Sequence, residues 1–412
     1  MVLFFAKFIS REALLQAINF AGGICVVHAL SVQEYAWYTI AVSMLGVGGI
    51  LTDVGIGAAL MSFAGRFWPD RSRVGALFSA ALQIRRLYFI CFSTLIFLTG
   101  TALLMRSDSP VMSSAAIMAL VITAVYFQLN FNLISILPKL EQHLGLVQYI
   151  AIRGALMRLA LLSLLFVAPS TVWAVVAALV GCCVQSFELR RRYAPVAEHA
   201  IGEHRSSIGE FKKEFFSITL KQAPGSVYYC VQGQLNILLL GFFGNAAGVA
   251  QLGALGRISA LFIIAQSVFS DILMPRFSIL KSRDEVLRRY CLYVGIFFVL
   301  ACGFLAFAYW FPESILFLLG EKYESLSHEL LLMLASASVS LIAGLLFSLN
   351  MSRAWVSPSW MQVVITVGLQ ALYLNFFPVN TVPAAVIFSS IGPLVSVGVY
   401  GFFAMFYLGK MA

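Results

Sequence analysis

Ionisable side chains inside long apolar segments are the residues of this sequence best suited to chemistry. Five of them interrupt such segments: Arg153, Arg158, Arg257, Asp53 and Asp271. A charge at the centre of a membrane helix costs about 2.5 to 3.5 kcal/mol on insertion scales, so these residues mark binding sites or buried pairs. Arginine binds phosphate groups through several N–H donors, and a carboxylate at depth can transfer a proton or bind Na⁺. Each aspartate can equally pair with an arginine or cap a helix break beside a nearby glycine or proline.

The basic residues differ in depth. Arg158 lies about 10 residues, or roughly 15 Å along a helix, from the end of its segment at Pro169, which places it near the membrane midplane. Arg153 lies nearer the cytoplasm, where it either joins the same site or snorkels to the interface. Arg257 either enters a central lumen or snorkels outward. Lys221, near the predicted cytoplasmic end of the first helix of the second half, completes the set of basic residues.

Polar side chains recur at helical spacing in the same kind of segment. They follow three helix faces: Glu12, Gln16, Asn19 and Gly23; Gln222, Ser226, Tyr229, Gln232 and Asn236; and Gln128 with Asn132. Such a stripe serves either hydrogen bonds between helices, worth about 0.6 to 2 kcal/mol each in membranes, or the lining of a wet cavity. Because the first segment of each half contains a stripe, we favour a shared central lumen. Pro224 and Gly225 predict a kink at the cytoplasmic end of the second stripe, unless Pro224 only begins that helix.

The polar residues lie in twelve apolar segments of about 20 residues, the length that crosses a bilayer. The predicted helices cover residues 13–30, 36–62, 85–105, 112–137, 149–168, 171–187, 218–243, 249–274, 290–310, 329–349, 359–377 and 383–408. Hydrophobic residues make up 61% of the chain, charged residues 11%, and the mean hydropathy is +0.92, which excludes a soluble fold. The sequence therefore predicts an all-α, polytopic transmembrane protein with two six-helix bundles.

The longest polar stretch, Glu188 to Ser217, separates the two predicted bundles. We expect an N-terminal bundle over residues 1–187, a cytoplasmic linker over residues 188–217 and a C-terminal bundle over residues 218–412. The linker is predicted to be solvated, with an anionic-lipid patch as the alternative.

Lys and Arg residues occur at every second junction between the apolar segments. Basic loops resist translocation, so these junctions are predicted to be cytoplasmic, and the intervening junctions contain only Arg106 and Lys322. Both termini then lie in the cytoplasm. The net charge of +9 follows from this distribution, and cations dispersed into short loops do not form the continuous face that binds nucleic acid.

Motifs for catalysis and metal binding are absent from the sequence. No H-E-x-x-H, G-x-S-x-G or Walker A motif occurs, so we do not expect an enzyme. His199 and His204 have no Cys or Asp companions, and the seven cysteines have no C-x-x-C spacing, so neither set predicts a metal site. With no cofactor and no nucleotide site, transport is expected to be driven by H⁺, by Na⁺ or by the substrate gradient itself.

Two stretches resemble a known family. The run from Ala29 to Ala59, ALSVQEYAWYTIAVSMLGVGGILTDVGIGAA, resembles the first hairpin of the polysaccharide branch of the MOP exporter superfamily, and Gln234 to Leu261 resembles its seventh and eighth helices. The resemblance covers the full length and the helix count. Ala36 stands where that family usually has glycine, and Asn236 stands where many members have aspartate, so the role of that carboxylate does not carry over.

The resemblance implies a flippase similar to the Wzx type, which moves undecaprenyl-pyrophosphate-linked oligosaccharide units across a bacterial inner membrane for surface polysaccharide synthesis. It implies alternating access of the two halves around the polar and basic residues named above, with Asp53 and Asp271 as ion-coupling candidates. The implied partners are the lipid-linked oligosaccharide, membrane lipids, a polysaccharide polymerase and a chain-length regulator.

Three alternatives remain at this point. One is a cation-coupled multidrug exporter of the same superfamily, although cationic drugs prefer acidic or aromatic pockets. Another is a membrane-embedded glycan polymerase or acyltransferase, for which His28 is the one loose candidate. A lipid II flippase would typically need two further helices, for which this chain has no room.

The charge distribution makes a direct prediction about topology. Green fluorescent protein fused after Lys410 should fluoresce, and alkaline phosphatase fused there should be inactive, because each reporter works on one side of the membrane only. Fusions after Lys322 should give the opposite result, with immunoblots as the control for expression. An active phosphatase after Lys410 would contradict the predicted orientation.

Overall fold

The computed structural model describes residues 2–53, 56–57, 60, 64, 70–141, 143–199, 207–259, 262, 266, 269, 277, 280, 282–353, 355 and 359–410. Within these ranges every regular element is a helix, which confirms the predicted all-α class. Contacts along the chain divide it into two compact units. The N-unit comprises Ser10–Gln234, and the C-unit comprises Leu235–Ala412 together with Met1–Ile9.

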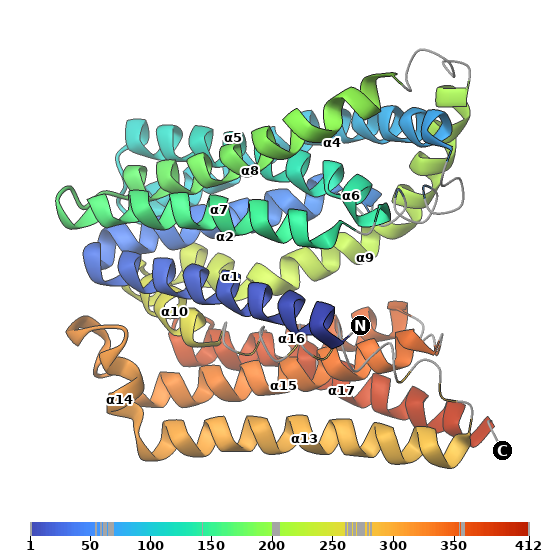
Figure 1. Ribbon diagram of the computed structural model, residues 1–412. Helices are drawn as coiled ribbons and strands as arrows, with labels where there is room; N and C mark the ends of the chain where they lie inside the picture. The colour runs from blue at the N-terminus through green and yellow to red at the C-terminus, as the bar shows by residue number, and fades with distance from the viewer. Residues whose placement is uncertain are drawn as a thin grey trace. The chain divides into compact units, whose positions relative to one another are not determined.

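Long helices run side by side across the view through the N-unit (Figure 1). Their bounds are α1 Val2–Ala29, α2 Val32–Asp53, α4 Arg71–Arg106, α5 Val111–Ile134, α6 Ile136–Leu140, α7 Leu144–Leu162, η1 Ser163–Phe166, α8 Thr171–His199 and α9 Ser207–Phe243. α8 packs against α5 and α7, and α2 packs against α4 and α5. By sequence, α1 and α9 each cross the boundary between the two units.

The C-unit is built around α15. Its elements are α10 Ala246–Ser259, α13 Arg283–Trp310, α14 Pro312–Phe317, η3 Glu321–Tyr323, α15 Ser327–Ser352, α16 Ser359–Phe376 and α17 Val382–Lys410. α15 packs against α10, α13 and α17, and α16 packs against α17.

The described residues contain nine helices that are long and apolar enough to cross a membrane, together with the shorter apolar helix Trp360–Phe376. Six of the nine belong to the first half of the chain, as predicted, and three match the predicted helices 290–310, 329–349 and 383–408. The predicted helix 249–274 agrees with α10 up to Ser259 and then passes largely outside the described residues. The protein is therefore a multi-pass membrane protein, and the count of twelve spans stays a prediction.

Four helices extend well beyond the predicted bounds. α1 begins at Val2, not near residue 13, and α9 begins at Ser207, within the last part of the predicted linker, not near residue 218. α4 begins at Arg71, not near residue 85, and α8 continues to His199 through the first part of the predicted linker. Apolar residues at helical spacing explain the extension of α4, because they enter a cluster of buried side chains with α8 and the end of α5. We call this the inner cluster; its members include Val74, Leu77, Phe78, Ala81, Leu133, Leu137, Ile150, Leu189 and Tyr193.

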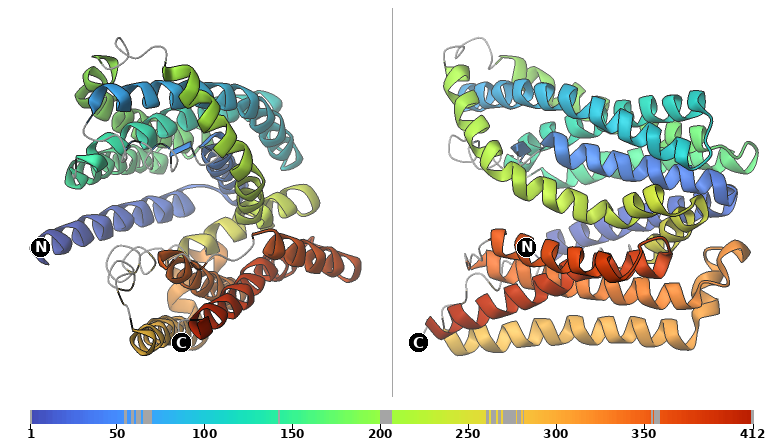
Figure 2. Two further views of the ribbon diagram at one scale, coloured as in Figure 1. Left: turned by 90° about the vertical axis from the view of Figure 1, so that its right-hand side faces the viewer. Right: turned by 180° about the vertical axis from the view of Figure 1, so that it is seen from behind.

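The helix α9 is continuous from Ser207 to Phe243, with Pro224 in its interior. The alternative that Pro224 only begins a helix is therefore wrong. Proline lacks the N–H of an interior helical residue and bends the helix in which it lies. Figure 2 accordingly shows α9 on a curved path.

Hydrogen bonds join three hairpins at one end of the N-unit, which contains the α1–α2, α4–α5 and α7–α8 connections (Figure 1). Glu34 accepts the backbone N–H of Thr171 at 2.6 Å, at the first residue of α8. Trp37 Nε1 donates to the Ser107 carbonyl at 2.8 Å, and the Gln33 amide donates to the same oxygen. We call this the outer end, because the charge distribution predicts that it lies outside the cytoplasm.

A polar network joins four helices inside the C-unit. Asn350 Nδ2 donates to the Tyr400 carbonyl at 2.9 Å, and Tyr290 OH donates to Asn350 Oδ1 at 3.5 Å. Tyr400 OH donates to Gln362 Oε1 at 2.9 Å, and the Gln362 amide donates to Ser396. All five residues are buried, so this network fixes α13, α15, α16 and α17 against one another.

The close crossing of α7 and α8 depends on Gly181. A methyl group at Gly181 would stand 3.0 Å from the Gly154 carbonyl oxygen and 3.2 Å from Arg158 Cβ. We therefore predict that Gly181→Ala lowers the free energy of unfolding by about 1 to 3 kcal/mol, because backbone cannot move aside as a side chain can. Thermal unfolding of the detergent-solubilised protein measures the change.

The matched control is Gly303→Ala in α13, where an added methyl group meets nothing within 4 Å among the described atoms. This control should be neutral or stabilising by up to about 1 kcal/mol, because alanine favours helix. Equal unfolding temperatures for the two variants would show that the crossing does not need glycine.

Candidate functional site

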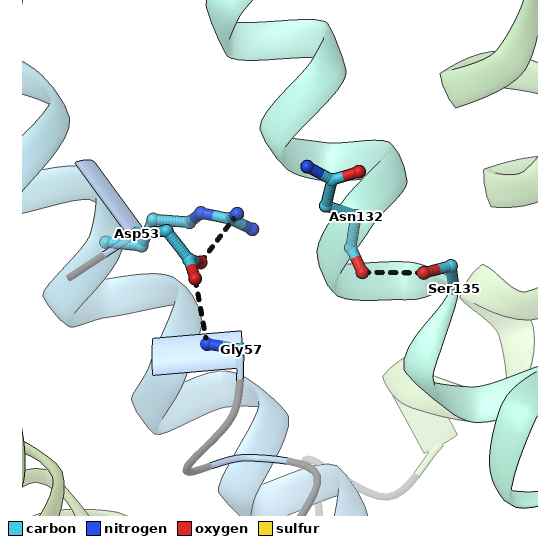
Figure 3. Close-up of polar contacts among 5 residues, drawn as sticks. Asp53, Gly57, Asn132 and Ser135 are labelled. Carbon is cyan, nitrogen blue, oxygen red and sulfur yellow. Dashed lines mark hydrogen bonds and ion pairs between the residues drawn. The ribbon is translucent and has the colours of Figure 1, made fainter. Parts of the chain in front are cut away.

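Arg85 of α4 is the one charged residue that is fully buried in the described part of the chain, at 4% exposure. Its Nη2 donates to Asp53 Oδ1 of α2 at 3.2 Å, and the two side chains are 5% and 33% exposed. Asp53 Oδ2 also accepts the backbone N–H of Gly57 at 3.3 Å, and Figure 3 draws both contacts. The two structural roles that the sequence allows for Asp53, a buried pair and a cap beside glycine, therefore occur together.

The guanidinium group of Arg85 is incompletely bonded. Its Nε and Nη1 atoms are buried and have no hydrogen-bond partner among the described residues. A guanidinium group has five N–H donors, and a buried donor without a partner costs about 1 to 3 kcal/mol or more when charged. Arg85 therefore retains the capacity to bind a further acceptor.

Sequence reasoning missed Arg85. It placed this residue among the cations of a cytoplasmic junction, because Arg85 and Arg86 adjoin the predicted start of a helix at residue 85. The apolar spacing of Val74, Leu77 and Ala81 was the available signal, since it extends the helix and brings Arg85 into its interior.

Three polar residues share one depth in the N-unit. Asp53, Arg85 and Asn132 each lie 21 residues from the outer end of their helix, from 32 to 53 in α2, 85 to 106 in α4 and 111 to 132 in α5. This length corresponds to about 32 Å of helix, which is close to the thickness of the bilayer hydrocarbon of about 30 Å. The three residues therefore lie at the level expected for the phosphates of the opposite, predicted inner, leaflet.

Two predicted site residues lie on α5, Asn132 in this layer and Gln128 next to it. Figure 3 shows the side-chain amide of Asn132 on the Asp53 side of α5. The backbone carbonyl of Asn132 accepts a hydrogen bond from Ser135 Oγ at 2.7 Å. Asn132 is exposed, whereas Gln128, one turn nearer the outer end, has a buried Oε1 without a partner in the described part of the chain. Both amides are available to a ligand.

Arg158 occupies a second position, nearer the outer end. Its Nη2 donates to Tyr38 OH at 2.9 Å, and its buried Nε has no partner among the residues described. Tyr38 is fully buried and lies six residues, about 9 Å, after Val32 at the start of α2. The structure thus separates Arg158 from the Arg85 layer along the bundle.

Arg153 pairs at the side of the bundle. Its Nη1 lies 2.9 Å from Glu188 Oε1 of α8, which Arg192 also approaches at 3.2 Å. The Arg153 side chain is 51% exposed and lies over the ring of Tyr149 at 5.8 Å. An exposed ion pair of this kind contributes about 0 to 1 kcal/mol in water.

The remaining predicted residues are distributed as follows. Gln16 donates to Glu12 at 3.0 Å along α1, and Asn19 is half-buried in the same helix. In α9, Gln232 Nε2 and Asn236 Oδ1 are buried without a partner in the parts described. Arg257 lies in α10 and is half-buried.

Three predicted residues cannot be placed in the site. Lys221 and Tyr229 lie within α9, but their side chains are outside what the structure describes, and Asp271 is outside the described residues altogether. The described residues contain no group of three or more His, Cys, Asp or Glu side chains that could hold a metal ion.

Solved structures match this chain along its whole length, although no protein-family model and no curated protein matches its sequence. An inward-facing multidrug resistance MATE family transporter of the MOP superfamily aligns with a TM-score of 0.74 at 13% identity, covering 98% of both chains. The chain has the MATE-like fold. The lipid II flippase MurJ in an inward closed conformation aligns with a TM-score of 0.71 at 10% identity, covering 97% of this chain and 87% of MurJ.

A third match is the MATE transporter VcmN of Vibrio cholerae, with a TM-score of 0.59 at 12% identity, covering 98% of this chain and 95% of that one. The predicted all-α, MATE-like architecture is therefore confirmed at the level of the fold. Identities this low leave the substrate to be argued from the side chains.

The contact between Arg158 and Tyr38 can be tested by removing one oxygen atom. Tyr38→Phe should lower the free energy of unfolding by about 1 to 3 kcal/mol, because a buried guanidinium N–H loses its acceptor. Tyr309→Phe is the control, since Tyr309 is 68% exposed. A double-mutant cycle with Arg158→Ala isolates the pair, and additive effects would show that the two side chains do not interact.

Proposed function

We propose that this protein is a flippase that moves a polyprenyl-pyrophosphate-linked oligosaccharide across a bacterial inner membrane by alternating access. The supporting observation is that Arg85 and Arg158, both within membrane helices, have buried N–H groups without a partner among the described residues. Donors of this kind suit an anionic phosphate headgroup and disfavour a cationic drug.

The fold is compatible with this proposal. It occurs in a protein described as a lipid II flippase and in multidrug resistance transporters, so it serves both lipid-borne and drug-like cargo. The charge of the buried groups favours the first kind of cargo here, because a cationic drug would have to approach Arg85 and Arg158 without compensation.

Amide groups complete the proposed site. The buried Oε1 of Gln128 and Nε2 of Gln232 lack partners in the described part of the chain, and sugar hydroxyls can serve both as donors and as acceptors. Lys221, Tyr229, Asn236 and Arg257 are proposed to join them, while Asp53 and Asp271 are the candidates for coupling to H⁺ or Na⁺. The polyprenyl chain can remain in lipid throughout.

The cellular setting follows from the same proposal. Both termini would lie in the cytoplasm, and the flipped unit would pass to a polysaccharide polymerase and its chain-length regulator on the outer side. The carrier lipid and the surrounding phospholipids would be the other partners.

Deletion of the gene in its host tests the function. We expect loss of a surface polysaccharide, with lipid-linked repeat units retained on the cytoplasmic leaflet. Repeat units that reach the outer leaflet unpolymerised would indicate a polymerase. Unchanged glycans with altered drug susceptibility would indicate an exporter and would overturn the proposal.

Arg158→Ala tests the site within the same assay. This variant should abolish transport while the protein remains in the membrane, because a diphosphate loses a charged donor in a medium of low dielectric. Lys322→Ala is the control, since Lys322 is an exposed cation in a connection at the far end of α14. Near-normal transport with Arg158→Ala would remove Arg158 from the site.

A further inference from the structure

The carboxylate of Asp53 is bound as an anionic ligand would be bound. One oxygen accepts Arg85 Nη2 at 3.2 Å, and the other accepts the Gly57 backbone N–H at 3.3 Å. A methyl group at Gly57 would stand 3.2 Å from Asp53 Oδ2, so glycine leaves the room that this oxygen occupies. A guanidinium and a backbone N–H thus donate to the two oxygens of one carboxylate, as they would to a bound anion.

The two charged partners differ in access. The Arg85 side chain is 5% exposed and the Asp53 side chain is 33% exposed, so the carboxylate is the partner that can leave. Arg85 adjoins buried apolar residues of α4, such as Ala81 and Ile84. It therefore stays in place when the carboxylate leaves. An anion reaching Arg85 through the exposed partner would take the position of that carboxylate.

The site also has spare donors for a ligand larger than a carboxylate. Arg85 Nε and Nη1 have no partner among the described residues. A diphosphate has more acceptor oxygens and more charge than one carboxylate, so it can use these donors and the Gly57 N–H together. The depth of Asp53, Arg85 and Asn132, about 32 Å from the outer ends of their helices, matches the level of the headgroups of the inner leaflet.

We propose that Arg85 and the Gly57 N–H form the site that first captures the diphosphate of the lipid substrate at the inner leaflet, and that Asp53 occupies this site until the substrate displaces it. The inference rests on the proposed function for the identity of the lipid. When no substrate is bound, Asp53 neutralises Arg85, because a guanidinium as deeply buried as this one would be strongly destabilising without an anion. It also excludes weaker anions, since a ligand must compete with an anion that is part of the chain.

Binding of farnesyl diphosphate to the purified full-length protein tests the site without any sugar. The protein is placed in nanodiscs of phosphatidylcholine, and binding is measured by calorimetry. Asp53→Asn should bind about tenfold more tightly than the unmodified protein, as expected if the carboxylate occupies Arg85 about nine-tenths of the time. Farnesol, which lacks the diphosphate, should not bind to either protein.

Asp70→Asn is the matched control. Asp70 also pairs with an arginine, Arg73 at 3.3 Å, but both side chains are about half exposed. This variant should bind farnesyl diphosphate as the unmodified protein does. Unchanged or weaker binding by Asp53→Asn protein that is folded, as judged by its unfolding transition, would overturn the proposal that Asp53 competes with the ligand.

A neutral double variant separates this role from a purely structural one. Asp53→Asn leaves Arg85 without its anion, and Arg85→Gln leaves Asp53 without its cation, so either single variant can fail to fold. Asp53→Asn with Arg85→Gln removes both charges together. We expect the double variant to fold, as judged by its unfolding temperature, but to lose farnesyl diphosphate binding and polysaccharide export. Export at the normal level from the double variant would mean that the pair is only structural and would overturn the proposal.

Dioleoyl phosphatidate serves as the competing phosphorylated lipid. It should displace farnesyl diphosphate weakly; equal competition would assign the site to bulk phospholipid headgroups and overturn its assignment to the substrate. Failure of the proposed function is recognised separately. In that case deletion of the gene leaves glycan export unchanged, whether or not the purified protein binds farnesyl diphosphate.

Discussion

The ion pair between Asp53 and Arg85 fixes the level at which α2 and α4 meet in the N-unit. A guanidinium that is 5% exposed needs an anion beside it, so α2 and α4 must meet at this level and α2 must end where Gly57 can support the carboxylate. The pair is also unequal, because one partner is enclosed and the other is accessible. Structure and proposed function both depend on this inequality: the enclosed cation stabilises the bundle and the accessible anion can be exchanged.

Hydrogen bonds between hairpins are the main polar contacts at the outer end of the N-unit, although Ser109 Oγ is buried there without a partner among the described residues. At the outer end, Glu34, Trp37 and Gln33 find partners on neighbouring hairpins, and Glu34 satisfies the first N–H of α8. At the inner level, Arg85 and Gln128 retain buried atoms without a partner among the residues described. Fully bonded networks make a helix bundle rigid, whereas incompletely bonded ones are suited to a ligand that supplies the missing bonds.

Much of the fold could be predicted from the sequence, because apolar length and the distribution of basic residues report directly on membrane crossing. The pairing of Asp53 with an arginine was also predictable, but its partner was not. Arg85 adjoins other cations in the sequence, and its burial depends on the approach of α2 to α4. Likewise, the distance from Pro169 gave a depth for Arg158 without revealing that Tyr38 lies opposite, since a single sequence does not identify the neighbour of a helix face.

The inner cluster lies partly beyond the hydrocarbon, because the residues of α4 from Val74 to Ala81 are more than 21 residues from the outer end of the helix. In lipid, helices associate through close packing and hydrogen bonds, whereas side chains surrounded by water associate through the hydrophobic effect. One continuous helix therefore passes through two solvents that stabilise it differently. During biogenesis the apolar spans can insert first, and the part of the inner cluster beyond the hydrocarbon can then pack as a small core. Urea would loosen this part of the N-unit first.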